Sequence, residues 1–303
     1  MEDRIRANGK YNFRKNKNLY LMMLPFMLLF FTFTVLPVIF SSVVSFTHYD
    51  VINLPRFVGF ENFRRLFLED DLFTLSIQNT LQIALFIGPF GYILAFTMAW
   101  LINELPRKLR AVLTIIFYAP SMSASIAFVM FLHLFSPDPF GWLNSFLLSW
   151  NLIDAPRLWL SDPTYMMPIV IGVSLWLSLG FGFLSFVAGL QTVDKNQYEA
   201  GYVDGVANRW QELWFITLPN MKPQLMFGAV MSITASLGVG ELTMQLTGFP
   251  SAQYATHTIA NHLLDFGSVR MEMGYASAIA LLLLGLMLGT NKLVQIFIRK
   301  VGT

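Results

Sequence analysis

The chain has 303 residues, of which 55% are hydrophobic and 13% are charged, and its formal net charge is +2. The surface of a soluble domain needs more charge than this, so lipid must surround most of the chain. The small net charge gives no support for nucleic-acid binding. The sequence contains no cysteine, which excludes disulfides, thiol catalysis and thiolate metal sites.

The apolar residues form six blocks that are long enough to span a membrane. A hydrocarbon core of roughly 30 Å needs about 20 helical residues at about 1.5 Å each. The blocks are apolar on every face, whereas barrel strands alternate in polarity. The sequence therefore predicts an all-α polytopic membrane protein with six transmembrane helices. The predicted spans are 19–46, 72–103, 111–136, 164–191, 220–246 and 273–298.

The positions of the basic residues predict the orientation. Most of the 20 Lys and Arg residues lie in the N-terminal tail, the second and fourth loops and the C-terminal end. Basic residues in short loops are retained in the cytoplasm. We therefore expect a cytoplasmic basic tail, 1–18, a membrane domain of six spans, 19–303, and a cytoplasmic loop, 192–222. The first apolar run is too long for a signal peptide, so we expect it to remain as a helix.

Two loops on the predicted outer side have their own patterns. In the loop 47–71, apolar residues recur at roughly helical spacing over 57–67. This spacing predicts a short amphipathic helix along the membrane surface. The loop 137–163 is rich in Pro, Asp and Trp, a composition that suits the outer interface, where indole rings favour the headgroup level.

The predicted cytoplasmic loop is the most informative segment. Connections of this length usually carry their own structure or a function. Asp194 or Asn196 can cap a helix over 197–203, and Gly205 can end that helix. A second amphipathic stretch, 208–216, follows. We expect a helix–turn–helix that projects from the membrane.

At these residues the chain resembles the coupling loop of ABC-type importer permeases. The family pattern is Glu-Ala-Ala, three residues, Gly, about nine residues, then Ile-x-Leu-Pro. The matching residues are Glu199, Ala200, Gly205, Ile216, Leu218 and Pro219. Gly201 replaces the second Ala of the pattern. The interval between Gly205 and Ile216 is one residue longer than the pattern, and we expect a turn to absorb the extra residue.

Further similarity points to the carbohydrate-uptake branch of that family, the maltose and multiple-sugar type. It lies in 45–47, 57–63, the Asn79-Thr80 pair, 246–248 and 273–278. The family has a Gly-Gly-Gly-Pro run after Leu-Thr-Gly. Here Phe249 and Pro250 follow instead, so we expect a different shape for this outer loop.

The resemblance implies a type I ABC importer permease fold and a transport subunit, not an enzyme. It also implies a second permease subunit, two cytoplasmic ATPase subunits and an external solute-binding protein, assembled in the lipid of a bacterial plasma (inner) membrane. The chain would form half of the path for a sugar or oligosaccharide. It has no Gly-x-x-x-x-Gly-Lys-Ser/Thr motif, so we expect ATP and magnesium on the ATPase subunits and no cofactor on this chain.

The resemblance assigns ATPase coupling to a group of residues in the cytoplasmic loop. They are Glu199, Ala200, Gly201, Asp204, Gly205, Leu218 and Pro219. Without the pattern, the two acids would be ordinary solvated side chains. With it, small residues let a short helix seat deeply in a groove of another subunit, and an acid at the rim can make a charge-assisted hydrogen bond.

Three residues are candidates for lining the solute path. Glu241 is a carboxylate inside an apolar block, and an ionisable group at membrane depth is a functional candidate. The alternative is that Glu241 lies near the outer interface and is simply hydrated. Asn79 and Trp176 are further candidates, because sugars present C–H faces that stack on rings and hydroxyls that need polar partners.

The histidines do not form a metal motif. His257 and His262 are five residues apart, with Asp265 beyond them, whereas ligands on one helical face prefer separations of three or four. We expect no metal site. His133 is expected to be an interfacial, hydrogen-bonded residue.

Two other functions stay open at this point. An ion-coupled secondary transporter of a small polar solute would place several ionisable groups within its spans, and only Glu241 qualifies. A membrane-embedded enzyme would need a nucleophile with a base, or a metal triad, and we find neither.

Overall fold

The computed structural model describes residues 17–122 and 124–299, and most of them are helical. The two strands among these residues, β1 (Thr47–His48) and β2 (Arg56–Phe57), pair as a short antiparallel hairpin. The predicted all-α class is confirmed. Most of the predicted basic tail lies outside the described residues.

Several helices of the described chain are long and apolar enough to cross a membrane. Four pass by length and composition, and a fifth is added if α13 and α14 count as one bent span. The predicted span 111–136 corresponds to α5 (Arg107–Met122) and α6 (Ala124–Leu134), which flank residue 123, outside the described residues. The number six therefore stays a prediction. The four helices are Lys17–Val44, Asp71–Asn103, Pro163–Thr192 and Met273–Ile298.

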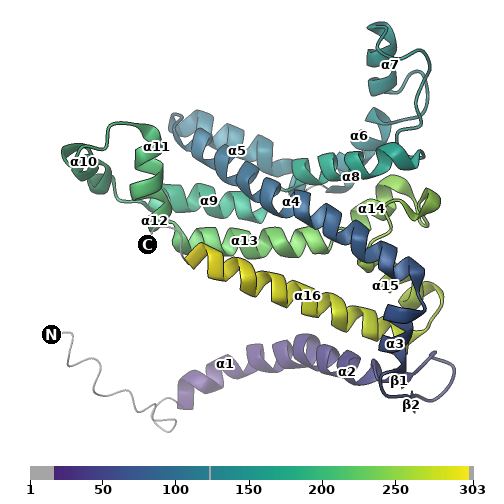
Figure 1. Cartoon of the computed structure of the whole chain (residues 1–303). Helices are drawn as coiled ribbons and strands as arrows, with labels where there is room; N and C mark the ends of the chain where they lie inside the picture. Colours follow the sequence, from purple (N-terminus) through teal and green to yellow (C-terminus); the bar gives the residue numbers. More distant parts are fainter. Residues whose placement is uncertain (1–16, 123, 300–303) are drawn as a thin grey trace.

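The first span lies along the edge of the bundle (Figure 1). It consists of α1 (Lys17–Phe30), a π-helical segment η2 (Phe31–Val35) and α2 (Leu36–Val44). The π-helical segment precedes Pro37, which has no N–H for a regular helical bond. The span contacts α16 (Met273–Arg299) through α2. None of its most apolar window is buried, so its apolar surface is open to lipid or to another subunit.

The fourth span is broken between Leu177 and Phe181, and the fifth is broken between Leu237 and Gly240. In the fourth, Asp162 caps α8 (Pro163–Leu177), and α9 (Phe181–Thr192) begins after a short break. In the fifth, α13 (Lys222–Leu237) bends by 44° into α14 (Gly240–Thr247). Both breaks contain a glycine, which can adopt the non-helical backbone conformations that a break requires.

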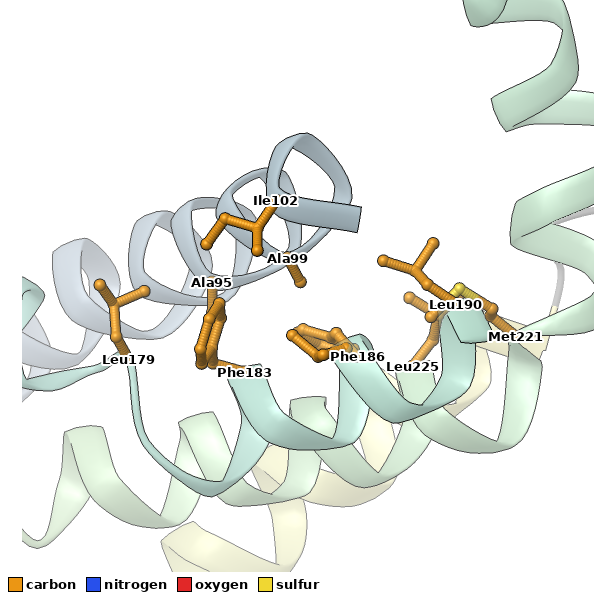
Figure 2. Packing of buried hydrophobic residues seen from close by; sticks show 10 residues of the cluster. Ala95, Ala99, Ile102, Leu179, Phe183, Phe186, Leu190, Met221 and Leu225 are labelled. Carbon is orange, nitrogen blue, oxygen red and sulfur yellow. The ribbon is translucent and has the colours of Figure 1, made fainter. Parts of the chain in front are cut away.

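The helices α4 (Asp71–Asn103), α9 and α13 pack closely against one another and form a hydrophobic core of the bundle (Figure 2). Phe183 and Phe186 of α9 are buried against Ala95 and Ala99 of α4. Gly228 of α13 lies so close that a Cβ atom there would overlap the Phe186 ring. In lipid, helices associate through close packing of small residues, because lipid tails are as apolar as leucine. These small residues therefore set the spacing of the core.

The loops gather at the two ends of the bundle (Figure 1). One end has the start of α1, the end of α16 and the four elements of the segment 195–220, named below. The other end, called the outer-loop end because the sequence predicts that it faces outward, has the hairpin and five short helices. The elements of the first end are α10 (Lys195–Val203), α11 (Arg209–Glu212), η3 (Leu213–Thr217) and α12 (Leu218–Asn220). The helices of the other end are α3 (Glu61–Leu68), α7 (Trp142–Ser149), η4 (Ala252–Tyr254), α15 (Ile259–Leu264) and η5 (Asp265–Val269).

Buried asparagines hold the outer loops in place. Asn62 of α3 donates hydrogen bonds to the carbonyl oxygens of Ser45 (2.8 Å) and Thr47 (2.9 Å). Asn144 of α7 donates to the carbonyl oxygen of Arg157, and its side-chain oxygen accepts from the backbone N–H of the same residue. These side-chain amides satisfy carbonyl groups of neighbouring loop segments, so the loops have defined conformations.

Gly274, near the start of α16, provides a test of how the first outer loop is packed. Its N–H donates to the carbonyl oxygen of Tyr49 (3.0 Å), and a Cβ atom here would overlap the carbonyl oxygen of Thr47. We predict that Gly274→Ala destabilises the protein by about 1–3 kcal/mol through overpacking. The measurement is thermal unfolding of the purified protein.

The matched control is Gly285→Ala in the same helix, where no atom lies within 4 Å of an added Cβ. This change should be neutral or slightly stabilising, because alanine is the better helix former. Equal melting temperatures for the two variants would contradict the packing described for Gly274.

Candidate functional site

The segment 195–220 forms two short helices with defined caps. The Asp194 carboxylate accepts a hydrogen bond from the backbone N–H of Asn196 (3.0 Å) at the start of α10. The side chain of Asn208 accepts from the backbone N–H of Gln211 (2.9 Å) at the start of α11. Gly205, between the two helices, has a φ of 91°, in the left-handed region that glycine adopts without strain. The helix–turn–helix geometry therefore depends on local sequence.

One face of α10 packs on the following helices. The hydroxyls of Tyr198 and Thr217 are hydrogen-bonded at 3.0 Å. A Cβ atom at Gly201 would come within 2.6 Å of the Ile216 side chain, and Gly201 is buried. The small size of Gly201 is therefore accounted for by packing within this segment.

The opposite face of α10 is open. Glu199, Ala200, Val203 and Asp204 are all exposed. Within the described chain, the carboxylates of Glu199 and Asp204 make no hydrogen bond or ion pair. This face therefore offers small and apolar groups with two unpaired acids beside them.

A π-helix begins within the interval that is one residue longer than the family pattern. Over η3, the N–H of Leu218 donates to the carbonyl oxygen of Leu213, five residues earlier. A π-helical turn inserts one residue into a helix without breaking it. Leu218 and Pro219 therefore follow on a continuous helical path from α11, and both are partly buried.

Arg209 ties this segment to the second span. Its guanidinium forms ion pairs with Glu104, which follows α4 (2.9 Å), and with Glu212 of α11 (2.8 Å). The Trp210 ring lies 5.4 Å from the ring of Trp100 in α4. This contact could not be predicted from the sequence, because Glu104 and Arg209 are far apart in the chain and no local spacing connects them.

Glu212 is the ionised centre of this contact. Burial alone would raise its pKa, but hydrogen bonds from Tyr202 and Arg209 outweigh burial and lower the pKa. The hydrogen bond to Glu212 and the negative charge of Glu212 raise the pKa of Tyr202. Tyr202 therefore stays a donor, and α10 is linked to α11 through a charged hydrogen bond.

Two adjoining cavities of about 620 and 300 Å³ lie where the fourth and fifth spans are broken. They share four lining residues, so their walls are continuous. The wall combines apolar and aromatic side chains with hydroxyl groups, the mixture that suits a polar solute with C–H faces. The shared residues are Ile87, Leu177, Ser178 and Ala235; among the hydroxyl-bearing residues are Tyr118, Ser121, Ser174, Ser232 and Thr234.

The three residues suggested for the solute path lie in different places. Glu241 is exposed and lines the smaller cavity, and its Oε1 accepts a hydrogen bond from Gln245 (3.1 Å). Trp176 is 54% exposed on the surface of α8 and does not belong to either lining. Asn79 is buried and donates to the carbonyl oxygens of Tyr254 (3.1 Å) and His257 (3.0 Å). Asn79 thus supports the last outer loop.

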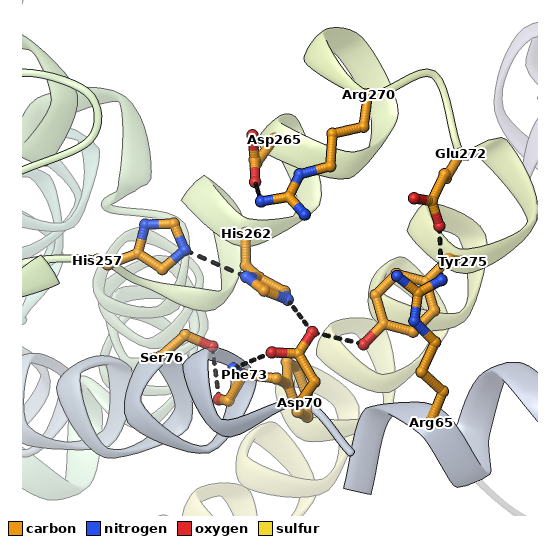
Figure 3. Close-up of polar contacts among 10 residues, drawn as sticks. All are labelled: Arg65, Asp70, Phe73, Ser76, His257, His262, Asp265, Arg270, Glu272 and Tyr275. Atoms are coloured by element: carbon orange, nitrogen blue, oxygen red, sulfur yellow. Dashed lines mark hydrogen bonds and ion pairs between the residues drawn. The ribbon is translucent and has the colours of Figure 1, made fainter.

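A chain of polar side chains joins three elements at the outer-loop end of the bundle (Figure 3). Asp70 caps α4 and also accepts hydrogen bonds from the Tyr275 hydroxyl (2.7 Å) and from Nε2 of His262 (3.0 Å). Nδ1 of His262 lies 3.2 Å from Nε2 of His257. Because Asp70 can only accept, His262 carries its proton on Nε2, and His257 must donate to it.

This network holds both histidines neutral. Burial lowers the pKa of His257 to about 4, and the neighbouring His262 acts in the same direction. Burial also lowers the pKa of His262, although Asp70 opposes the shift. The pKa of Asp70 is lowered because its hydrogen bonds outweigh the effect of burial. Asp265, which the sequence placed beside these histidines, forms an ion pair with Arg270 instead (2.7 Å).

Comparison with protein families identifies the chain. Residues 87–303 match the family of the "Binding-protein-dependent transport system inner membrane component". The chain belongs to this family and is therefore a transport subunit of the ABC importer permease class, as the coupling-loop pattern suggested.

Individual relatives agree with this family. The chain is 31% identical over 289 residues to a probable ABC transporter permease, YesP, of Bacillus subtilis (strain 168), which covers 92% of this chain and 91% of that protein. It is 28% identical over 233 residues to the lactose transport system permease LacF of Rhizobium radiobacter, and this match covers 77% of this chain and 76% of LacF. A bacterial ABC transporter that imports alginate has a chain of similar structure, with a TM-score of 0.76, 25% identity and coverage of 96% and 98%.

The outer network predicts a loss of stability in acid. His257 has a pKa of about 4 in the folded chain, against an ordinary value near 6.5. The unfolded chain therefore takes up its proton first, and stability should fall as the pH decreases from 6.5 towards 4. The measurement is the melting temperature of the purified protein across this range.

Replacement of His257 by Gln should reduce the slope of this profile, because the titrating group is removed. The exposed His48 provides the control, and His48→Gln should leave the slope as it is. An unchanged slope in His257→Gln would show that another group causes the acid sensitivity.

Proposed function

We propose that this chain is one of two permease subunits of a binding-protein-dependent ABC importer, and that it forms half of the path for a sugar or oligosaccharide. Family membership supports the transport role. Two observations support a saccharide: the cavity wall mixes hydroxyls with apolar and aromatic groups, and a relative transports lactose. The ring faces and hydroxyls of a sugar fit such a wall.

The observation that carries the proposal is the packed loop 195–220. Tyr198 and Gly201 hold α10 from one side, while Glu199 remains unpaired on the other. A rigid surface helix with small residues and an unpaired acid fits a groove on another subunit. We assign this groove to a cytoplasmic ATPase subunit, with Glu199, Ala200, Asp204, Leu218 and Pro219 in the contact region.

Gly201 and Gly205 contribute indirectly to this docking. Gly201 lets α10 lie against Ile216, and Gly205 provides the left-handed turn between the helices. ATP and magnesium bind to the ATPase subunits in this proposal, and this chain holds no cofactor. Arg209 then transmits motion of the docked loop to α4 through Glu104.

The orientation follows from the same proposal. The loop 195–220 and the ends of α1 and α16 lie at one end of the bundle (Figure 1), and the basic residues favour that end as cytoplasmic. The outer-loop end then faces the solute-binding protein. The open first span provides a surface for the second permease or for membrane lipid. The location is a bacterial plasma (inner) membrane.

Glu199→Ala tests the docking surface. We expect loss of ATPase binding and of solute uptake with normal membrane insertion, because Glu199 is exposed and its carboxylate makes no hydrogen bond or ion pair within the described chain. Gly205→Leu should have the same effect through strain, since a left-handed non-glycine residue costs roughly 1–2 kcal/mol. The measurement is recovery of the ATPase with the tagged permease, together with uptake by cells.

The matched control is Lys108→Ala, an exposed charged residue at the start of α5. It should leave both assays unchanged. Normal ATPase recovery and uptake in Glu199→Ala would remove the docking assignment.

Single cysteines in this cysteine-free chain test the orientation. Ser145 in α7 and Ala207 before α11 are exposed, and α7 and α11 lie at opposite ends of the bundle (Figure 1). An impermeant thiol reagent should label Ser145→Cys in spheroplasts, and Ala207→Cys only after the membrane is opened. The opposite pattern would reverse the proposed topology. Protein without an introduced cysteine gives the background.

A further inference from the structure

Glu241 gives the cavity wall a net negative charge. Among the described residues that line the two adjoining cavities, it is the one carboxylate, and none is Lys, Arg or His. The other polar groups of the wall are hydroxyls and the amide of Gln245. A solute in these cavities therefore meets a wall of neutral donors and acceptors with one acid.

No cation of the described chain neutralises this acid. The hydrogen bond to Glu241 comes from the neutral amide of Gln245, and none of the ion pairs among the described residues includes Glu241. Gln245 lies one helical turn further along α14, so the two side chains present a joined polar surface to the cavity. The hydrogen-bonding groups of this surface are therefore available to a solute in the cavity.

Because the cavities share four wall residues, a solute in the larger cavity reaches the part of the wall that bears Glu241. A carboxylate accepts hydrogen bonds from sugar hydroxyls and strengthens them through its charge. It repels a second carboxylate that comes close to it. The wall therefore distinguishes saccharides by charge.

We infer that Glu241 is a specificity-determining residue that excludes anionic saccharides, so that the solute is a neutral or cationic saccharide without uronic acid groups. This inference rests on the proposed transport of a saccharide and adds the charge class of that solute. The likeness to the alginate importer, whose solute is an acidic polysaccharide, then extends to the fold and not to the solute.

The test uses three trisaccharides of matched length: neutral maltotriose, anionic trigalacturonate and cationic chitotriose with free amines. Each is titrated into the purified complex of permease and ATPase subunits, and the rise in melting temperature gives its affinity. We expect trigalacturonate to bind about tenfold more weakly than maltotriose or to give no shift. The difference should shrink as salt is raised from about 0.05 to 0.5 M, because salt screens the repulsion.

Variants of Glu241 and Gln245 test whether Glu241 causes the difference in affinity between the neutral and anionic sugars. Glu241→Gln removes the charge, keeps the shape and should bring the affinities for the neutral and anionic sugars together. Glu241→Asp keeps the charge and should keep the difference. Gln245→Glu adds a second charge on the same surface and should widen it. The melting temperature of each variant without sugar shows whether the complex is intact.

The outcomes separate the inference from the proposed function. Binding of trigalacturonate as tight as that of maltotriose, or a difference that persists in Glu241→Gln, would overturn the role of Glu241 while a saccharide path stands. If none of the three sugars shifts the melting temperature of the intact complex, the saccharide assignment itself is overturned.

Discussion

The constraint on which this structure depends is that lipid offers no hydrogen bonds to an open backbone. A spanning helix can be interrupted only where protein or a polar cavity covers the freed groups. The fourth and fifth spans are interrupted after Leu177 and after Leu237, and residues of both breaks line the same pair of cavities. The breaks and the cavities are therefore two aspects of one arrangement, and the proposed solute path lies where these two helices are interrupted.

The rest of the chain supports these breaks from both ends. At the outer-loop end, Asn79 of the unbroken α4 donates to the loop that follows α14, and Thr80 accepts from the first N–H of α15. Asp70 joins α4 to α15 and α16. At the other end, the pair of Arg209 and Glu104 attaches the loop 195–220 to the same helix. Helix α4, which is continuous from Asp71 to Asn103, thus connects the proposed docking face to the cavity wall.

The sequence could predict the features that depend on local pattern. Long apolar runs predict membrane helices, so the observed helices lie within a few residues of their expected positions. Asp194 and Gly205 predict the limits of α10, because capping and left-handed turns are set by single residues. The coupling-loop pattern predicts the family that the comparison shows.

Features that depend on contacts between distant residues could not be predicted in this way. From the sequence alone, the missing side chain of Gly201 fits a docking groove or an internal contact equally well, and only the position of Ile216 distinguishes them. Asn79 is a polar residue in an apolar span, the same signal that Glu241 gives. In the structure, Asn79 donates to backbone carbonyls of the same chain, whereas Glu241 faces a cavity beside a neutral amide. A polar group whose bonds are complete within the chain supports the fold, and one whose capacity is left open to a cavity is available to a solute.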